Sequence, residues 1–286
     1  MSDTLRDISD TALWVAMFRA AESERPDAIF RDPFARRLAG ARGEQIVRAM
    51  NRRMSIEWPI VVRTAVTDEL VLRCVQQGCA TVLNLAAGLD ARPWRLSLPA
   101  PLRWIDADKP GMVAHKSKAM ADVVPACAYE AVGIDLADRD ARKHLFERAA
   151  QHGPVLVLSE GLLVYLDEDA VAGLADQLFA STAMRWWLFD LASPQLLRML
   201  NRRFEHDLQA AASPMRFAPT EGTAFFARHG WREVQYRSTW LEAMRLRRTP
   251  RMAWMWNLLG KLAGERKREQ FRRFSGIVLT ERGEPN

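Results

Sequence analysis

Glu160 is the residue whose surroundings point most directly to chemistry. It interrupts an otherwise apolar stretch, residues 155–166. An ionised carboxylate in such a stretch needs a positive or hydrogen-bonding partner, because burial without one costs several kcal/mol. A ligand that carries an ammonium and a sulfonium group is one such partner, and an ion pair with Arg63 or Arg92 is the structural alternative. The sequence leaves both interpretations open.

Acidic residues also follow two other apolar segments. Asp106 and Asp108 stand at the end of segment 102–106, and Asp135 follows segment 128–134. A carboxylate at the carboxyl end of a strand can accept hydrogen bonds from both ribose hydroxyls, and an acidic side chain with neighbouring backbone groups can read an adenine edge. Capping of the next helix is the alternative for the first two. Three successive strands that end in polar residues on one rim therefore indicate a nucleoside site more strongly than any one of them.

The loop 84–90, with the sequence Asn-Leu-Ala-Ala-Gly-Leu-Asp, follows the first apolar run. Its small residues, including Ala86 and Gly88, let a ligand approach the backbone, and ligands of doubly wound sheets bind at this edge. The loop is not a dinucleotide fingerprint, which needs three glycines where this loop has one. An adenosyl ligand without phosphates places fewer demands on the loop. We expect a ligand contact here, with an ordinary turn as the alternative.

Short apolar runs separated by helix-length segments must position these residues. Continuous apolar strands that alternate with helices are typical of a parallel sheet covered on both faces. The runs are 81–85, 102–106, 128–134, 155–158 and 186–191. Two further strands of mixed alternation, 232–237 and 274–280, have no long helix between adjacent sheet positions. They predict an antiparallel edge.

Helices are predicted ahead of the first strand. Residues 11–22 show the three-and-four spacing of a helix with one buried face, and a second helix begins at 34–39. A longer helix covers 44–77 and is interrupted near Trp58-Pro59, because proline removes a helical hydrogen bond. We expect these helices to act as a cap over the site.

The chain is thus expected to form one catalytic domain with elaborations. Residues 1–80 form the cap, residues 81–192 form the cofactor-binding core, and residues 193–286 hold a lid insertion and the strands that complete the sheet. Charged residues and Pro214 break the apolar pattern of 193–219. That stretch is expected to be a mobile insertion over the substrate side.

Composition excludes several function classes. A chain of 286 residues with 49% hydrophobic and 27% charged residues can bury a full core. The net charge of +6 comes mostly from arginines scattered along the chain, which is typical of a solvated surface rather than a nucleic-acid-binding stripe. The three cysteines match neither a zinc site nor a redox pair. With a polar N-terminus and no apolar run near 18 residues, the sequence predicts a cytoplasmic protein that binds neither membrane nor nucleic acid.

Five segments in order resemble the leucine carboxyl methyltransferase family. This family includes a bacterial branch of carboxyl and hydroxyl methyltransferases from natural-product pathways. The segments are 11–23, 31–35, Arg63-Thr64 with Asp68, 82–92 and 159–166. The likeness covers roughly residues 9–192, with looser similarity to the end. Five blocks in the right order are far more specific than any single one.

The resemblance implies an α/β fold, the Rossmann-like class I methyltransferase sheet of seven strands, mostly parallel with an antiparallel edge strand. It implies S-adenosyl-L-methionine (SAM) as the cofactor and no metal. Arg63 would hold the carboxylate of the methionyl moiety, and Glu160 would face its amino end. Asp108 would take the ribose hydroxyls, with Asp106 a close second. The other implied contacts are Ala86 and Gly88 along the methionyl moiety, Asp135 and Leu136 beside the adenine, and Tyr165 nearer the acceptor.

Two positions depart from the family pattern. Family members usually have glycine where Ala86 stands, which would set the loop slightly farther from the cofactor. They often have arginine where Ala137 stands, and in the branch that modifies a protein phosphatase this arginine helps to bind the acceptor carboxylate. Its absence argues against a protein C-terminus as the substrate.

The implied chemistry is methyl transfer to an oxygen of a small molecule. A methyl sulfonium is already electrophilic, so the enzyme mainly aligns the acceptor oxygen and excludes water, and alignment can supply about 7 to 11 kcal/mol of the barrier. A carboxylate is ionised at pH 7 and needs no general base, whereas a hydroxyl does. His206 and His229 are the candidate bases by placement. The pattern favours a methyl ester on a carboxylic acid, with hydroxyl methylation as the alternative.

Two other classes of protein are alternatives to a small-molecule O-methyltransferase. A nucleic-acid N-methyltransferase is disfavoured, because Ser159-Glu160-Gly161 replaces the expected Asn-or-Asp-Pro-Pro-aromatic motif after the fourth strand. A non-catalytic module that binds SAM remains the alternative from outside the enzymes. Turnover separates it from a methyltransferase.

Overall fold

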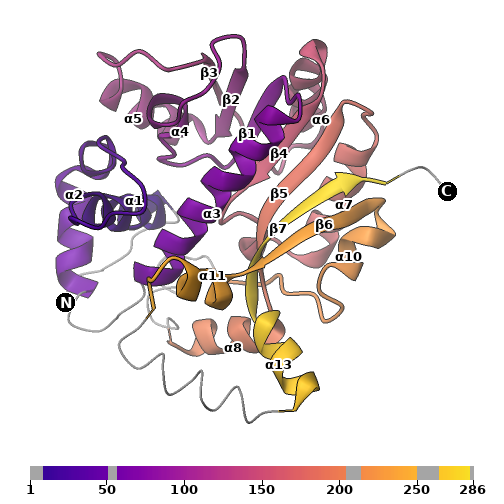
Figure 1. Cartoon of the computed structure of the whole chain (residues 1–286). Coiled ribbons are helices and arrows are strands. Elements are labelled where there is room, and N and C mark those ends of the chain that lie inside the picture. The colour runs from indigo at the N-terminus through magenta and orange to yellow at the C-terminus, as the bar shows by residue number, and fades with distance from the viewer. Residues whose placement is uncertain (1–8, 51–56, 204–213, 250–263, 284–286) are drawn as a thin grey trace.

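The computed structural model describes residues 9–50, 57–203, 214–249 and 264–283. Within them, a seven-stranded sheet has the order β3-β2-β1-β4-β5-β7-β6 (Figure 1). Its strands are β1 Thr81–Leu85, β2 Arg103–Asp108, β3 Ala128–Gly133, β4 Val155–Ser159, β5 Met184–Ala192, β6 Trp231–Ser238 and β7 Ser275–Arg282. Each of the strands expected from the apolar runs is present.

The first five strands are parallel, and β7 runs antiparallel to both of its neighbours, β5 and β6. The antiparallel strand therefore lies one position in from the edge, and β6 forms the edge itself. Five consecutive residues of β7 are buried, whereas in β6 only the two end residues, Trp231 and Ser238, are buried. The more apolar of the two strands takes the inner position because it is covered on both faces.

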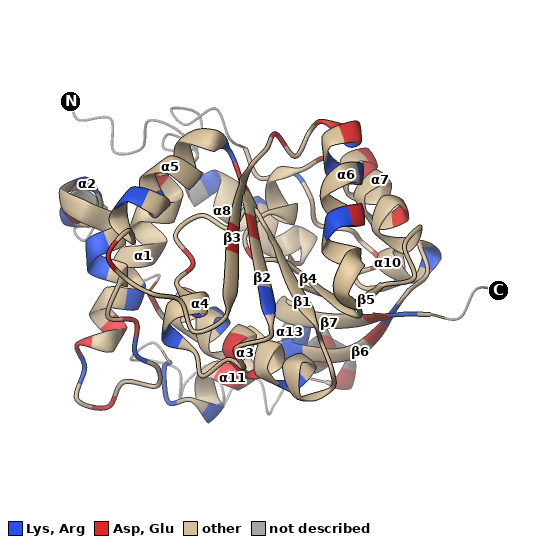
Figure 2. Cartoon of the chain, turned by 90° about the horizontal axis from the view of Figure 1, so that it is seen from above, with Lys and Arg blue, Asp and Glu red and all other residues tan. Residues whose placement is uncertain are grey.

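Helices cover both faces of the sheet (Figures 1 and 2). The helices are α1 Ser9–Ser23, α2 Ala35–Met50, α3 Glu57–Gln76, α4 Arg92–Arg95, α5 Pro110–Ala119, α6 Arg139–Ala149, α7 Glu168–Phe179, α8 Pro194–Arg203, α10 Ala224–Arg228, α11 Thr239–Arg245 and α13 Glu265–Arg272. Two short 3₁₀ turns are η1 Ala150–His152 and η2 Leu163–Tyr165. No described helix is both long and apolar enough to cross a membrane.

Two apolar cores lie on opposite faces of the sheet. Leu83 and Val157 belong to the core that α6, α7 and α10 cover, whereas Val82 and Leu156 belong to the core that α3 covers. Successive strand residues point to opposite faces, so a strand between two cores has buried residues on both of its faces. All five residues of β1 and of β4 are buried for this reason.

The helices before β1 form the expected arrangement with one shift. The predicted interruption near Trp58-Pro59 is not found, because α3 begins at Glu57 and Pro59 lies in its first turn. Proline is tolerated there, because the first helical N–H groups have no partner within the helix. Helix α2 ends at Met50, and residues 51–56 between the two helices lie outside the described residues. A break occurs inside α2 at Gly40, whose φ of 57° is non-helical. The predicted insertion 193–219 begins as helix α8, and residues 204–213 within it lie outside the described residues.

Basic and acidic segments are interspersed over the helices in Figure 2. Several exposed arginines pair with acidic neighbours, such as Arg36 with Glu24 and Arg37 with Asp122. Exposed pairs of this kind contribute about 0–1 kcal/mol each. In this part of the chain the basic charge lies on a mixed surface.

Candidate functional site

A cavity of about 1160 Å³ opens at the carboxyl ends of β1, β2, β4 and β5. Side chains of α1 and α3 and of α8 complete its wall. Eight of the nine residues predicted for the site line it. They are Arg63, Ala86, Gly88, Asp108, Asp135, Leu136, Glu160 and Tyr165. The switch point of the sheet lies beside β1, which is where open α/β sheets bind their ligands.

Asp108 ends β2 at the rim of the cavity. Its Oδ2 accepts a hydrogen bond of 2.6 Å from the backbone N–H of Gly88, and its Oδ1 accepts one of 2.7 Å from that of Lys109. Burial raises the pKa of the Asp108 carboxyl, although these two N–H groups oppose the shift. The carboxylate thus fixes the β1 loop against the end of β2 and stays on the cavity wall.

Asp106 does not line the cavity, so the prediction of Asp106 as a ribose ligand has no support in the geometry. Its Oδ2 lies 2.6 Å from Lys116 Nζ and accepts a hydrogen bond of 2.9 Å from Tyr129 Oη. Its Oδ1 accepts from Asn84 and Trp104. Only 2% of Asp106 is exposed. With four donors around it, this carboxylate is part of a buried polar cluster between β2 and α5.

Ala86 and Gly88 both adopt left-handed backbone conformations in the loop after β1. Their φ angles are 53° and 50°. The Cβ atom disfavours this region in alanine, whereas glycine adopts it freely. Ala86 therefore has the backbone path of the glycine that usually stands at this position in the family that the sequence resembles.

Replacing Ala86 by glycine is expected to raise the free energy of unfolding by up to about 1 kcal/mol. The left-handed conformation costs a residue with a Cβ about 1–2 kcal/mol, and the greater freedom of glycine in the unfolded chain offsets about 0.5–1 kcal/mol of the gain. Ala87→Gly is the matched control, because Ala87 has no positive φ and should lose stability. Urea denaturation measures both, and a loss in both variants would contradict the strain at Ala86.

The loop after β3 carries Asp135 and Leu136. Asp135 is exposed, and its Oδ1 accepts a hydrogen bond of 2.9 Å from the backbone N–H of Ala137. Arg142 of α6 donates to the carbonyl of Leu136. These contacts hold the loop on the cavity wall, with Leu136 packed beside the sheet core.

Arg63 of α3 stands between two carboxylates in the cavity wall. Its Nε lies 3.0 Å from Glu160 Oε1, and its Nη1 lies 3.4 Å from Asp190 Oδ2. The other oxygen of Asp190 accepts a hydrogen bond of 2.5 Å from the backbone N–H of Gly161. Asp190 is 25% exposed at its side chain, against 15% for Glu160. One guanidinium and two carboxylates therefore face the same cavity.

The charges of this group are strongly stabilised but incompletely hydrogen bonded. Burial opposes ionisation of Glu160, but Arg92 and Arg63 hold the pKa of its carboxyl below the usual value. Burial likewise lowers the pKa of Arg63, but Glu160 and Asp190 hold it above the usual value. Arg63 Nε and Glu160 Oε2 are buried and lack a hydrogen bond of good geometry, but both belong to ion pairs, with Glu160 Oε1 at 3.0 Å and with Arg92 Nη2 at 2.8 Å. The structural alternative stated from the sequence, an ion pair of Glu160 with Arg63 or Arg92, is therefore present.

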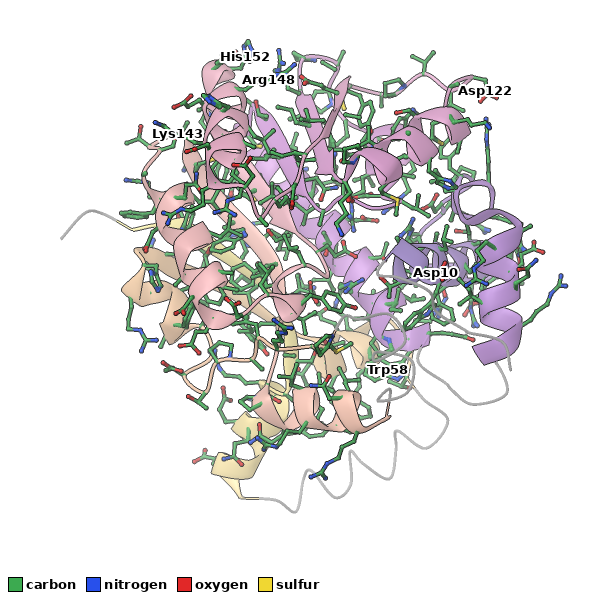
Figure 3. The ribbon with its side chains drawn as sticks, turned by 180° about the vertical axis from the view of Figure 1, so that it is seen from behind. Asp10, Trp58, Asp122, Lys143, Arg148 and His152 are labelled. Atoms are coloured by element: carbon green, nitrogen blue, oxygen red, sulfur yellow. The ribbon has the colours of Figure 1, made fainter. Side chains whose placement is uncertain are left out.

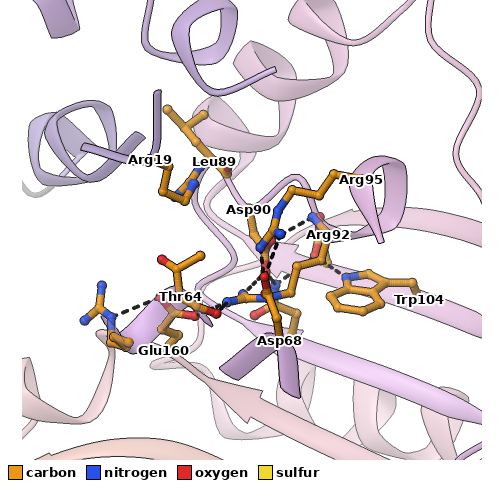
Figure 4. A network of polar contacts seen from close by, with 12 residues as sticks. Arg19, Thr64, Asp68, Leu89, Asp90, Arg92, Arg95, Trp104 and Glu160 are labelled. Carbon is orange, nitrogen blue, oxygen red and sulfur yellow. Dashed lines mark hydrogen bonds and ion pairs between the residues drawn. The ribbon is translucent and has the colours of Figure 1, made fainter. Parts of the chain in front are cut away.

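Arg92 connects Glu160 to a buried ion-pair network (Figure 4). Its Nη2 lies 2.8 Å from Glu160 Oε2, and its Nη1 and Nε each lie 2.6 Å from Asp90 and Asp68 respectively. Asp68 also pairs with Arg95 at 2.6 Å. Arg92 is 4% exposed at its side chain. The network joins α3, the β1 loop and α4, and its residues Asp90, Arg92 and Arg95 line the cavity.

A second contact ties the cap to the same loop. Arg19 of α1 donates a hydrogen bond of 2.6 Å to the carbonyl of Leu89 and pairs with Asp32 at 2.9 Å. Asp32 and Arg19 are both buried. The predicted cap is thus fastened to the loop that follows β1.

Tyr165 lies in η2, on the cavity wall next to Arg63. Burial raises the pKa of its phenol, Arg63 opposes the shift, and Thr11 of α1 shares a hydrogen bond with it. The phenol is therefore neutral near pH 7, and it can donate or accept a hydrogen bond.

Asp190 and Arg92 were missed as cavity residues by the sequence reasoning. A usable signal existed for Asp190, which interrupts the apolar run 186–191 as Glu160 interrupts its own stretch. Arg92 was considered only as an ion-pair partner of Glu160, and that pair is present at 2.8 Å. Its pairs with Asp90, two residues away, and with Asp68 of α3 were not predicted.

None of the histidines in the described part of the chain lines the cavity. His229 Nδ1 lies 2.6 Å from Asp176 of α7, away from the cavity lining, so the geometry does not support His229 as a base and agrees with the alternative that it is not part of the site. His152, labelled in Figure 3, lies in η1 at the outer end of α6. His206, the other candidate, lies outside the described residues. No group of three or more His, Cys, Asp or Glu residues with the geometry of a metal site occurs within the described ranges.

Comparison with known proteins adds to this geometry. A sequence model of the family described as leucine carboxyl methyltransferase matches residues 12–179. A Streptomyces coelicolor protein named as an S-adenosyl-L-methionine-dependent methyltransferase is 32% identical over 241 residues, which span 77% of this chain and 82% of the relative. The family model covers most of α1, the loop after β1 and the residues after β4 up to the end of α7.

Two solved structures share the fold. A DUF574 family protein from Streptomyces avermitilis has a TM-score of 0.60 and 14% identity, with 93% of this chain and 96% of that chain covered. A protein from Thermobifida fusca described as a methyltransferase has a TM-score of 0.57 and 14% identity, with coverage of 98% and 96%. At these identities the two structures support the architecture alone.

Proposed function

Because the chain belongs to the leucine carboxyl methyltransferase family, we propose that it is a SAM-dependent O-methyltransferase that forms a methyl ester on a small-molecule carboxylic acid. One observation carries the proposal. A single cavity joins a rim carboxylate, Asp108, to the oppositely charged residues Arg63 and Glu160. SAM has a ribose at one end and an amino-acid group at the other, and its sulfonium supplies the methyl group when it is bound.

The residues at the methionyl end fit a zwitterionic amino-acid group. Arg63 and Glu160 carry opposite charges, and both line the cavity. Arg63 would bind the carboxylate of the ligand, and Glu160 would bind its ammonium group. If the ion pair between Arg63 and Glu160 opens, each of the two side chains therefore gains a new partner of opposite charge. A ligand with only one of the two charges would leave a buried charge unpaired, which is costly. This requirement favours the complete amino-acid group.

The residues at the other end fit a nucleoside. Each oxygen of Asp108 accepts one backbone N–H and keeps lone-pair capacity for a ribose hydroxyl. Asp135 and Leu136 lie on the next strand end, where they would flank the adenine. Ala86 and Gly88 leave the loop backbone open to the ligand between the two ends.

The acceptor side supports a carboxylate. Methyl transfer to a carboxylate requires alignment and exclusion of water but no proton removal. None of the described histidines lines the cavity, whereas Tyr165 does. We assign Tyr165 to positioning of the acceptor oxygen through a hydrogen bond from its phenol.

The direct test supplies purified protein with SAM that carries a labelled methyl group and with a panel of carboxylic acids. We expect label in the products that mild base releases as methanol, which identifies a methyl ester. Label that resists base would identify methylation of a hydroxyl instead. SAM binding with no transfer to any acid or to a cell extract would identify a binding module and overturn the proposal.

Asp108→Asn is expected to raise the Kd for SAM by about 10- to 100-fold, since a hydrogen bond to a charged group contributes about 1.5–3 kcal/mol. Asp106→Asn is the matched control. It should leave the Kd nearly unchanged and lower the melting temperature, because Lys116 loses its charged partner. Calorimetry and thermal denaturation of both variants measure this. A larger loss of affinity in Asp106→Asn would show that the ribose binds Asp106 rather than Asp108.

A further inference from the structure

The cavity has more room than one cofactor needs. Pockets for small molecules and cofactors are usually about 300–1,000 Å³, whereas this cavity is about 1160 Å³. Its lining continues past Tyr165 and Asp190 to a part bounded by α8, α11, α13 and the start of α3. We name this part the outer lobe and define it by Trp58, Leu196, Met199, Trp240, Phe271 and Phe274.

The outer lobe is apolar because of how its elements are patterned. On α8, Leu196, Met199 and Leu200 follow the three-and-four spacing of one helix face and line the cavity. Figures 1 and 3 show α8 and α13 next to one another below the sheet, and Figure 3 places Trp58 at the adjoining end of α3. Trp240 stacks edge to face on Trp58 at 6.0 Å. These contacts form a wall from four elements.

Part of this wall is exposed. Met199 and Phe271 are 48% and 43% exposed, and both line the cavity. Phe271 stacks on Trp240 at 5.6 Å, which extends the aromatic wall to the surface. Large apolar side chains grouped at the mouth of a cavity are typical of a binding site for an apolar partner.

The outer lobe has almost no means to bind charge. Its described lining includes no Lys, Arg, Asp or Glu beyond Asp190 at its inner end. Its polar side chains near that end are the hydroxyls of Thr239 and Ser275, whose oxygens lie 3.0 Å apart and share a hydrogen bond. A second charge on the acceptor would lose its hydration in this lobe and find no partner, which is unfavourable.

We propose that the acceptor is a monocarboxylic acid with an extended apolar body, whose carboxylate lies near Tyr165 and whose body fills the outer lobe. The inference rests on the proposed function for the position of the carboxylate. The apolar body of the acceptor is inferred from the outer lobe alone. Acceptors with a second charge at the far end of the body, such as dicarboxylates, are disfavoured, because the described lining of the outer lobe offers that charge no partner.

The test measures binding without turnover. Protein saturated with S-adenosylhomocysteine is titrated calorimetrically with butanoate, hexanoate, octanoate and decanoate, and with octanedioate as the charged counterpart of octanoate. We expect the affinity to rise about three- to fourfold per added CH₂, which corresponds to about 0.8 kcal/mol per buried CH₂. Octanedioate should bind at least tenfold more weakly than octanoate. Affinity that is independent of chain length, or equal binding of octanedioate, would overturn the inference.

Variants of the outer lobe test where decanoate binds. Met199→Ser with Phe271→Ser should weaken decanoate binding about tenfold or more and leave S-adenosylhomocysteine binding unchanged. Val124→Ser is the control, because Val124 is 87% exposed and does not line the cavity. Equal effects of the control and the double variant would also overturn the inference. Chain-length-dependent binding without any methyl ester would instead contradict the proposed function and leave the lobe assignment standing.

Discussion

Arg63→Lys is expected to weaken SAM binding by about 10- to 100-fold although the charge is retained. The guanidinium presents a planar fork that matches a carboxylate with two parallel hydrogen bonds, whereas an ammonium is a point charge. In the structure the fork already spans Glu160 and Asp190, at 3.0 and 3.4 Å. Lys cannot hold both contacts and a ligand carboxylate together. Calorimetry with SAM measures the loss.

Glu160→Gln and the double variant decide between two roles of this pair. If Glu160 binds the ammonium of SAM, Glu160→Gln should cost less affinity than Arg63→Lys, because an amide oxygen still accepts a hydrogen bond. If the two residues serve only each other, each single change leaves an unpaired buried charge, and replacing both by neutral residues should recover much of the stability. Unchanged affinity with a large fall in melting temperature would therefore identify a structural ion pair.

Arg92→Met is expected to produce the largest loss of stability. The change leaves Asp68, Asp90 and Glu160 without the guanidinium that they share. Removal of one partner from a buried ion pair costs about 3–5 kcal/mol, and the melting temperature should fall by on the order of 10 °C. Arg36→Met is the control, since Arg36 pairs with Glu24 at the surface and should have little effect.

Arg92→Met should also change how the stability of the protein depends on pH below neutrality. Arg92 holds the pKa values of Asp90 and Glu160 below their usual range. A carboxylate with a lowered folded-state pKa contributes stability that is present above the unfolded-state pKa, near 4, and is lost as the pH falls through the folded-state value. Without Arg92 both pKa values rise, so acid unfolding should begin at a higher pH. Acid titration followed by circular dichroism tests this, and coincident curves for Arg92→Met and the unmodified protein would refute it.

The strands could be predicted because burial on both faces leaves a local mark. In β1 and β4 every residue is buried, so both sequences are mainly apolar, with polar residues only at Thr81, Asn84 and Ser159. Glu160 was recognisable for the converse reason, as a charge within such an apolar sequence. The order of β6 and β7 was harder to predict, since it depends on which strand pairs with β5 rather than on the pattern within either strand.

The sequence could not show that Asp108, rather than Asp106, lies on the cavity wall. Asp106 and Asp108 are two residues apart, so they point to the same face of β2 and their patterns are equivalent. What separates them is Lys116 on α5, which pairs with Asp106, and the N–H of Gly88, which reaches Asp108. The partners of Arg92 are separated in the same way, with Asp68 on α3 and Glu160 after β4. Such contacts are set by tertiary packing, and spacing along the chain carries no trace of them.

The position of β7 between β5 and β6 also affects how the protein folds during synthesis. β6 is made first, yet its sheet partner in the described structure is β7, which is made about 40 residues later. At the usual rate of about 5–20 residues per second, the ribosome needs roughly 2 to 8 seconds for that interval. Until then β5 exposes an unpaired edge beside Trp187 and Phe189, and edges of this kind recruit other chains. Slower translation between β6 and β7 would therefore lengthen the time for which the edge of β5 is unpaired.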